Sequence, residues 1–362
     1  MFKMPKLCFF SSRKLPLIGI DITSSAIKLL EIHPYDNKLQ VASYGVASLE
    51  EGAVIDRRIK DEESVARSIK QVIDKTQPST QRTAVAVPTT AVITRTLNLP
   101  IALSDNEMEA LIMLEAEQHI PYPLNEVAID FQRQPPLNLN DENQPVLLVA
   151  CRKEVTNQLD YILDAAGLEP LVTDVEKFAM ERSLGLIVNK LPKQQKNQAN
   201  PIVAVADIGA HTSTLNVLCD GKIIYSREQL FGGKQLTDNI QQHYGLSREE
   251  ADFLKNKSDL PADYSATLLK PFKTALIQQI ERQLQLFYSS MPYHAIDSLI
   301  LAGGSSAIEN LPQRLEEQLK VPTYIANPFV DMVLSDKVNA QALAQDAPAM
   351  MIACGLAMRL WV

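Results

Sequence analysis

The chain has 362 residues, which is more than one ordinary domain needs and enough for two lobes that each bury a core. Apolar residues make up 46% and charged residues 22%, a balance typical of folded globular proteins that excludes global disorder. The formal net charge of -8 gives the surface no general attraction for nucleic acid, so a nucleic-acid-binding function is excluded as a first interpretation.

The start of the chain and its cysteines bear on where the protein works. Lys3, Lys6, Arg13 and Lys14 make residues 1–16 basic, with an apolar run too short for a signal peptide. We interpret this segment as a flexible leader, with contact to anionic lipid as the alternative. The cysteines lie too far apart for a disulfide framework or a metal cluster, and no run approaches the roughly 18 to 20 apolar residues of a membrane span. We therefore expect a cytoplasmic protein that meets the membrane only peripherally.

Short apolar runs between turn residues predict the core of a first lobe over residues 17–89. The pattern predicts hairpin-linked strands at 17–21, 26–32 and 38–44, a helix at 62–74 and a strand at 83–88. A compact subdomain is predicted at 90–168, because Ser104 and Glu107 have the capping-box spacing before an apolar-periodic segment that ends near His119. Its other predicted elements are strands at 127–131 and 146–150 and a helix at 154–166.

A helix predicted at 174–186 makes residues 169–189 the connecting helix of the first lobe. The polar segment 190–200 is interpreted as a linker to a second lobe at 201–345, with a small insertion at about 237–263. An apolar stripe from Leu268 to Phe287 is interpreted as core. Residues 346–362 are expected to form a C-terminal helix that returns to the first lobe.

The strand pattern at the start of the second lobe repeats that of the first. Strands predicted at 202–207, 214–218 and 223–226 again form hairpins, and the first of them ends at Asp207 as the strand at 17–21 ends at Asp21. Because the two aspartates occupy equivalent points, the sequence predicts an internally duplicated α/β fold of two lobes.

Each aspartate opens a tight turn rich in small and hydroxyl residues, Asp21-Ile22-Thr23-Ser24-Ser25 and Asp207-Ile208-Gly209-Ala210-His211-Thr212-Ser213. Backbone N–H groups and hydroxyls in such turns bind anions, and an aspartate can hold magnesium through water. A third element follows, in which an apolar strand runs into Gly303, Gly304 and Ser305. Paired glycines let the backbone approach a flat base closely. The chain has neither a P-loop nor a dinucleotide-binding fingerprint, so any nucleotide site depends on these three turns.

This triple resembles the two phosphate motifs and the adenosine motif of the actin, sugar-kinase and heat-shock-chaperone ATPase superfamily. The resemblance implies an actin-like ATPase fold that binds ATP and Mg, with Asp21 and Asp207 serving the metal. It implies phosphate contacts at Ser24, Ser25, Gly209, Thr212 and Ser213, and adenosine contacts at Gly303, Gly304 and Ser305.

Within the superfamily, residues 90–168 resemble the displaced subdomain of the FtsA and PilM group. Further segments that look like this group imply nucleotide contacts at Lys28, Gly232, Gly233, Lys234, Asp252 and Lys255. FtsA continues beyond the last connecting helix to a membrane-binding helix, whereas this sequence stops at Val362. The PilM family is therefore the better match, and an FtsA-like membrane tether of cell division is the alternative.

Resemblance to the PilM family implies an ATP-binding scaffold of the type IV pilus inner-membrane platform, supporting pilus biogenesis and twitching motility. It implies as partner the N-terminal peptide of a PilN-like inner-membrane protein, gripped beside 90–168, with pilus motor ATPases and the platform protein as further partners. The alternative is a slow ATPase or phosphotransferase, which needs a group to orient water or accept a proton. His211 is interpreted as a loop residue and Glu115 and Glu117 as solvent-facing, so no catalytic residue is assigned.

Overall fold

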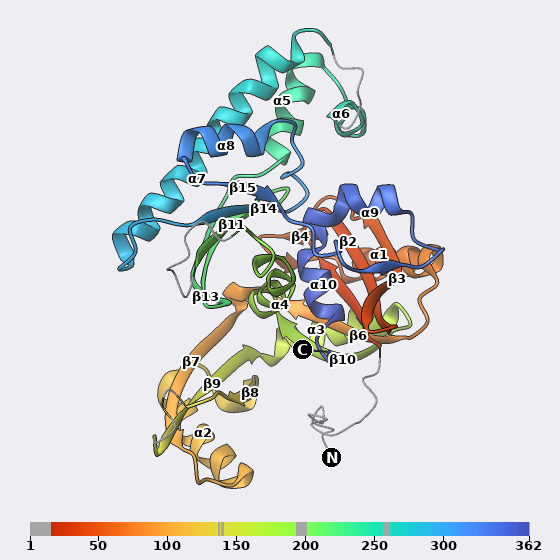
Figure 1. The fold of residues 1–362 in the computed structure, drawn as a ribbon. Helices are drawn as coiled ribbons and strands as arrows, with labels where there is room; N and C mark the ends of the chain where they lie inside the picture. Colours follow the sequence, from red (N-terminus) through yellow and green to blue (C-terminus); the bar gives the residue numbers. More distant parts are fainter. Residues whose placement is uncertain (1–15, 137, 139–140, 193–200, 256–260, 362) are drawn as a thin grey trace.

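The computed structural model describes residues 16–136, 138, 141–192, 201–255 and 261–361, and within them two α/β lobes share one topology (Figure 1). The sheet of the first lobe has the strand order β10-β6-β1-β2-β3-β16, and that of the second has the order β13-β12-β11-β14-β15. In both, the first three strands are antiparallel neighbours, and the fourth and fifth pair in parallel beside the first. The predicted duplication is therefore confirmed.

The strands lie close to the predicted positions. In the first lobe they are β1 (Ile18–Ile22), β2 (Ala26–Tyr35), β3 (Lys38–Ser48), β6 (Arg82–Val87) and β10 (Glu169–Val175). In the second they are β11 (Ile202–Ile208), β12 (Ser213–Cys219), β13 (Lys222–Gln229), β14 (Ser298–Ala302) and β15 (Thr323–Ile325). Because β1, β11 and β14 each lie between two other strands and are covered on both faces, their sequences are almost continuously apolar.

Helices cover the sheet of the first lobe. Helix α1 (Glu62–Thr76) begins at its N-cap Asp61, which accepts a hydrogen bond from the backbone N–H of Ser64, and it buries an apolar stripe in the core of this lobe. Helix α3 (Lys153–Ala165) packs into the same core through Leu159, Ile162 and Leu163. The predicted boundary at residue 168 is therefore wrong for this helix, which belongs by its packing to the first lobe.

The inserted subdomain has a core of its own. It contains β7 (Val92–Pro100), α2 (Asp105–His119), β8 (Val127–Arg133) and β9 (Asn143–Arg152), with the sheet order β7-β9-β8 and short 3-10 turns at Thr89–Ala91 and Leu124–Glu126. The predicted capping box of Ser104 and Glu107 starts α2, whose Met108 and Ile112 pack on the sheet. The subdomain projects from the first lobe, away from the helices of the second (Figure 1).

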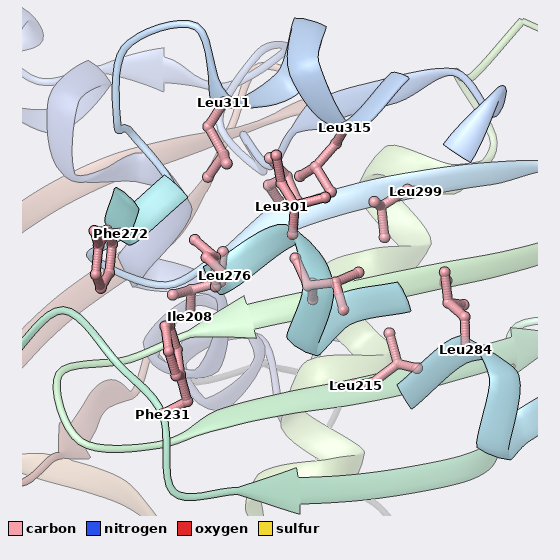
Figure 2. Packing of buried hydrophobic residues seen from close by; sticks show 14 of the residues in the cluster. Ile208, Leu215, Phe231, Phe272, Leu276, Leu284, Leu299, Leu301, Leu311 and Leu315 are labelled. Carbon is pink, nitrogen blue, oxygen red and sulfur yellow. The ribbon is translucent and has the colours of Figure 1, made fainter. Parts of the chain in front are cut away.

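The second lobe buries the largest apolar cluster, between its sheet and the long helix α7 (Lys270–Ser290) (Figure 2). The predicted stripe from Leu268 to Phe287 is core, and Phe231 stacks on Phe272 with ring centroids 5.6 Å apart. The other helices here are α5 (Lys234–Tyr244), α6 (Arg248–Lys255), a π-helical turn at Ser265–Leu269 and α8 (Leu311–Leu319).

Some predicted boundaries are corrected. Residues 169–175 form the parallel edge strand β10, so the connecting helix α4 (Glu176–Val188) begins at Glu176 and not at Asp174. The expected C-terminal helix consists of a 3-10 turn, Ala347–Met350, followed by the short α10 (Met351–Ala357). The small insertion begins earlier than predicted, since α5 starts at Lys234.

The remaining elements join the two lobes. Strand β16 (Val333–Leu334) and helix α9 (Ala340–Asp346) come from the second half of the chain, yet β16 pairs with β3 of the first lobe. A two-stranded hairpin, β4 (Val54–Ile55) and β5 (Arg58–Ile59), follows β3. The leader up to residue 15 and most of the predicted linker lie outside the described residues. None of the helices in the described ranges is long and apolar enough to cross a bilayer.

Candidate functional site

The three predicted turns meet at one cavity of about 1140 Å3 that is lined by both lobes. The turn after β1 lies on one side of it, and the turns after β11 and β14 lie on the other, because β11 and β14 are parallel neighbours that end at the same edge of their sheet. The predicted residues that line the cavity are Asp21, Ser24, Ser25, Lys28, Asp207, Gly209, Thr212, Gly233, Lys234, Asp252, Lys255, Gly303, Gly304 and Ser305.

Two residues that were predicted to contact the nucleotide, Ser213 and Gly232, are not among those that line the cavity. Ser213 is buried at the start of β12, where its hydroxyl donates to the carbonyl of Phe231 at 2.6 Å. Gly232 lies against the turn after β11, and a Cβ atom there would meet the carbonyl oxygen of Ala210 at 2.3 Å. Neither residue lines the cavity, because each holds one turn of the second lobe against another.

Backbone hydrogen bonds fix the turns of the second lobe to one another. The N–H of Gly209 closes the turn after β11 by donating to Thr212 O at 2.9 Å. The carbonyl of Gly209 accepts from Gly233 N at 3.0 Å, and Ser305 N donates to Ile208 O at 3.0 Å. These hydrogen bonds fix the positions of the turns after β11, β13 and β14 relative to one another.

Gly303, which lines the cavity, also packs closely on the turn after β11. Its φ of 84° lies in a region that glycine adopts without strain and other residues rarely adopt. A Cβ atom added there would meet Asp207 Oδ1 at 2.5 Å and the carbonyl oxygen of Ile208 at 2.4 Å. Gly303 therefore permits close packing on the turn after β11. Gly304, where an added Cβ would meet nothing within 4 Å, presents the open backbone to the cavity.

An ion pair dominates the first-lobe side of the cavity. Lys28 stands opposite Asp21 in the antiparallel register of β1 and β2, and its Nζ lies 2.8 Å from Asp21 Oδ2. Burial by itself lowers the pKa of Lys28, but the attraction of Asp21, Asp207 and Glu176 outweighs it and raises that pKa. Lys28 is therefore a fixed positive charge between carboxylates of both lobes.

On the second-lobe side, burial raises the pKa of Asp207, and the charges of Lys28 and Arg57 oppose that rise. Asp207 and Asp21 face the same cavity from the ends of equivalent strands. Within the described residues, no three histidine, cysteine or carboxylate side chains gather as a ready metal cluster. The two carboxylates of Asp21 and Asp207 fit the needs of magnesium, which keeps several waters and takes one or two carboxylates together with substrate phosphates.

His211 joins the turns after β1 and β11 across the cavity. Its Nδ1 lies 2.7 Å from the hydroxyl oxygen of Ser24 in the other lobe. Burial lowers the pKa of His211, and the nearby positive charges of Lys234 and Arg248 lower it further, which favours the neutral imidazole.

Glu176 and Arg57 are site residues that sequence reasoning missed. Glu176 is the first residue of α4, and burial raises its pKa to about 7 although Arg57 opposes the rise. Arg57 Nη1 lies 2.7 Å from Glu176 Oε2. Recognition of β10 as a parallel strand would have placed Glu176 beside Asp21 at the sheet edge, whereas Arg57, in a hairpin turn, has no comparable local signal.

The remaining predicted residues form the far end of the cavity. Lys255 Nζ donates to Gly233 O at 3.2 Å, and burial lowers the pKa of Lys255. Asp252 accepts from the hydroxyl of Thr237 at 2.9 Å, and Lys234 pairs with Asp238 at 2.9 Å. These donors and carboxylates, on two adjacent helices, could contact a ribose and a base.

The cavity extends between the first lobe and the inserted subdomain. This extension, which we call the groove, is lined by Ile59, Ile93, Ile120, Tyr122, Val127 and Val155. Tyr122 is 44% exposed, and Arg152 lies over its ring with the guanidinium carbon 5.8 Å from the centroid. Apolar side chains and one partly exposed aromatic ring therefore line this part of the cavity.

Comparison with known proteins places the chain in a family. A family model described as type IV pilus assembly protein PilM matches residues 19–361. A solved PilM-PilN type IV pilus biogenesis complex is 25% identical, with 96% of this chain and 99% of that chain covered and a TM-score of 0.75. The ethanolamine utilization protein EutJ from Carboxydothermus hydrogenoformans is 14% identical over 95% of this chain and 90% of that one, with a TM-score of 0.53, which bears on the fold alone. The predicted actin-like ATPase fold is thus confirmed, and the chain belongs to the type IV pilus assembly protein PilM family.

Proposed function

We propose that this protein is a scaffold of the type IV pilus assembly platform that binds MgATP between its lobes and takes the N-terminal peptide of a PilN-like membrane protein in its groove. The observation that carries the nucleotide site is the meeting of two aspartate turns and a glycine turn around one cavity. On this proposal the protein lies at the cytoplasmic face of the inner membrane and supports pilus biogenesis and twitching motility. Pilus motor ATPases and the platform protein are candidate further partners.

In this assignment Asp21 and Asp207 hold the magnesium ion, which when bound neutralises phosphate charge. Lys28 exchanges part of its pairing with Asp21 for a phosphate oxygen, since its three ammonium hydrogens can serve both. The hydroxyls of Ser24 and Thr212 add donors from the two lobes. Adenosine lies along Gly304, with Lys255 and Asp252 beside it.

Isothermal titration calorimetry tests the nucleotide site. Asp207→Ala should weaken MgATP binding by at least about tenfold, because a charge-assisted contact contributes roughly 1.5 kcal/mol or more. Asp74→Ala, on an exposed position of α1 outside the cavity, is the matched control and should bind like wild type. Undiminished MgATP binding by a folded Asp207→Ala variant means that the second phosphate turn is wrongly assigned.

The peptide proposal rests on the groove and on the solved PilM-PilN complex. Fluorescence anisotropy with a labelled PilN N-terminal peptide should show saturable binding. Tyr122→Ala should weaken it about tenfold, since exposed aromatic anchors carry much of peptide affinity. Leu114→Ala, at a 57% exposed residue of α2 outside the groove, should bind like wild type. Absence of saturable binding by the wild-type protein, with or without ATP, excludes the peptide function.

Slow ATP hydrolysis is a second candidate, favoured by Glu176. A carboxyl group with a pKa of about 7 that faces the phosphate end of the cavity can accept a proton from water near neutral pH. Analysis of the nucleotide retained after purification and incubation separates the candidates. A scaffold without hydrolysis keeps ATP, whereas an ATPase accumulates ADP and loses that conversion in Glu176→Gln.

A further inference from the structure

Residues 49–60, here called the strap, leave the first lobe after β3 and return to it before α1. Its first residue is fixed to the lobe, because Leu49 N donates to Ser25 O at 2.9 Å, and its last residue is joined to the strap itself, because Lys60 N donates to Ala53 O at 2.8 Å. Ala53 and Val54 are 2% and 6% exposed and belong to the core of the first lobe. The strap is therefore a structured part of that lobe.

The strap nevertheless makes ion pairs with the second lobe at two separate points. Glu51 pairs with Arg248 at the start of α6, and it lies 3.5 Å from Lys234 Nζ of α5. Arg57 pairs with Glu228 of β13, and its Nη2 lies 3.5 Å from the hydroxyl of Thr214. Glu51 and Arg57 both line the cavity, so these ion pairs join the two lobes beside it.

Two residues at the tip of the strap have a left-handed backbone conformation, and one of them is Arg57, which makes the ion pairs. Asp56 and Arg57 have φ values of 48° and 59°, and such tight hairpin turns favour asparagine followed by glycine. An arginine in this left-handed conformation costs free energy that a glycine would not. In return, its guanidinium reaches Glu176 of its own lobe and Glu228 of the other.

We propose that the strap is a gate that controls how fast nucleotide enters and leaves the cavity. This inference rests on the proposed nucleotide site. A nucleotide held by turns of both lobes escapes when the lobes separate, and the ion pairs of Glu51 and Arg57 join the lobes beside the cavity. They must break first, whichever nucleotide is bound. The strap therefore raises the barrier to exchange in both directions and changes the affinity little.

Stopped-flow fluorescence with the full-length protein and a fluorescent ATP analogue in magnesium buffer tests this gate. Arg57→Gly removes the guanidinium and relieves the turn, and this relief offsets part of the stability that is lost with the ion pairs. Association and dissociation rate constants should both rise about tenfold, as expected from loss of a partly buried ion pair. Glu51→Gln should raise both by a smaller factor, because Glu51 is 59% exposed at its side chain.

Glu50→Gln is the control, because it removes a charge from the same strap at a residue that is not among those lining the cavity and that pairs with Arg67 of its own lobe. Its rates should equal those of wild type. Unchanged rates in folded Arg57→Gly overturn the gate and leave the nucleotide site intact. Faster dissociation with unchanged association and an equally weaker affinity also overturns it, because Arg57 is then a direct ligand. Failure of the wild-type protein to bind nucleotide overturns the proposed site and the gate together.

Discussion

Removal of the positive charge between the two aspartate turns is expected to destabilise the protein strongly. Lys28 and Asp21 pair at 2.8 Å with side-chain exposures of 14% and 4%, so solvent screens the pair little. In Lys28→Met the methylene stem is retained, but Asp21 is left as a buried carboxylate without its partner. Breaking a buried pair in this way costs about 3 to 5 kcal/mol. We therefore expect Lys28→Met to lower the free energy of unfolding by about 3 kcal/mol.

Urea unfolding at pH 7 without nucleotide, followed by circular dichroism, measures this loss. Arg67→Met is the control, because Arg67 pairs with Glu50 at 3.2 Å while the two side chains are 57% and 66% exposed, and its loss should stay below about 0.5 kcal/mol. The double variant Asp21→Asn/Lys28→Met should recover at least about 1 kcal/mol, since it no longer buries an unpaired charge. Equal losses in Lys28→Met and Arg67→Met, or no recovery in the double variant, refute the reasoning.

Three further predictions follow from the site and the helix packing. His211→Ala should keep MgATP affinity within about threefold by calorimetry, because hydroxyls and backbone groups supply the donors of its turn; a complete loss would make His211 a ligand. Burial holds the pKa of Glu176 at about 7, above its ordinary 4.5, so the folded state binds more protons than the unfolded state between these values. Wild type should therefore lose stability relative to Glu176→Gln as the pH rises from 4.5 to about 7, and parallel urea-derived curves over that window would contradict the assignment. Gly355→Ala should lower the free energy of unfolding by more than about 2 kcal/mol, because its Cβ would meet Ala179 O at 1.8 Å. Gly185→Ala, in α4 with open space around it, should raise that free energy by roughly 0.5 to 1 kcal/mol, and an equal response of the two variants in urea would refute the packing.

The duplicated fold could be predicted because its signal is local. Each lobe begins with a buried strand that ends in aspartate and continues through hairpins, so Asp21 and Asp207 mark equivalent points without knowledge of any long-range contact. The edge strand β10 was missed because it is half exposed and alternates polar and apolar residues only briefly. Parallel pairing with β6, which lies far away in sequence, makes it a strand.

The turns that form the candidate site could be predicted from the sequence, whereas several of its charged residues could not. Asp21, Asp207 and the glycines follow directly after buried strands, and such positions meet at the edge of a sheet. Arg57 and Glu228 form an ion pair only because the two lobes face each other. The pattern of apolar and polar residues along the sequence contains no signal for such a contact between lobes. Ser213 and Gly232 occur in the predicted motifs, but the side to which each residue points depends on how the turns pack together.

The return of the chain to the first lobe has a consequence for synthesis on the ribosome. Gly19 of β1 packs so closely on α10 that an added Cβ would meet the carbonyl oxygen of Ala353 at 2.2 Å, and β3 receives its neighbour β16 from the second half of the chain. The apolar face of β1, among the earliest segments to emerge, therefore stays uncovered until a helix encoded far downstream has been made. The second lobe, apart from this return, draws its sheet and core from one continuous stretch of sequence and can fold while synthesis continues. The lobe synthesised first is thus the lobe completed last, and a nascent chain cut short before α10 presents an open sheet face to chaperones and proteases.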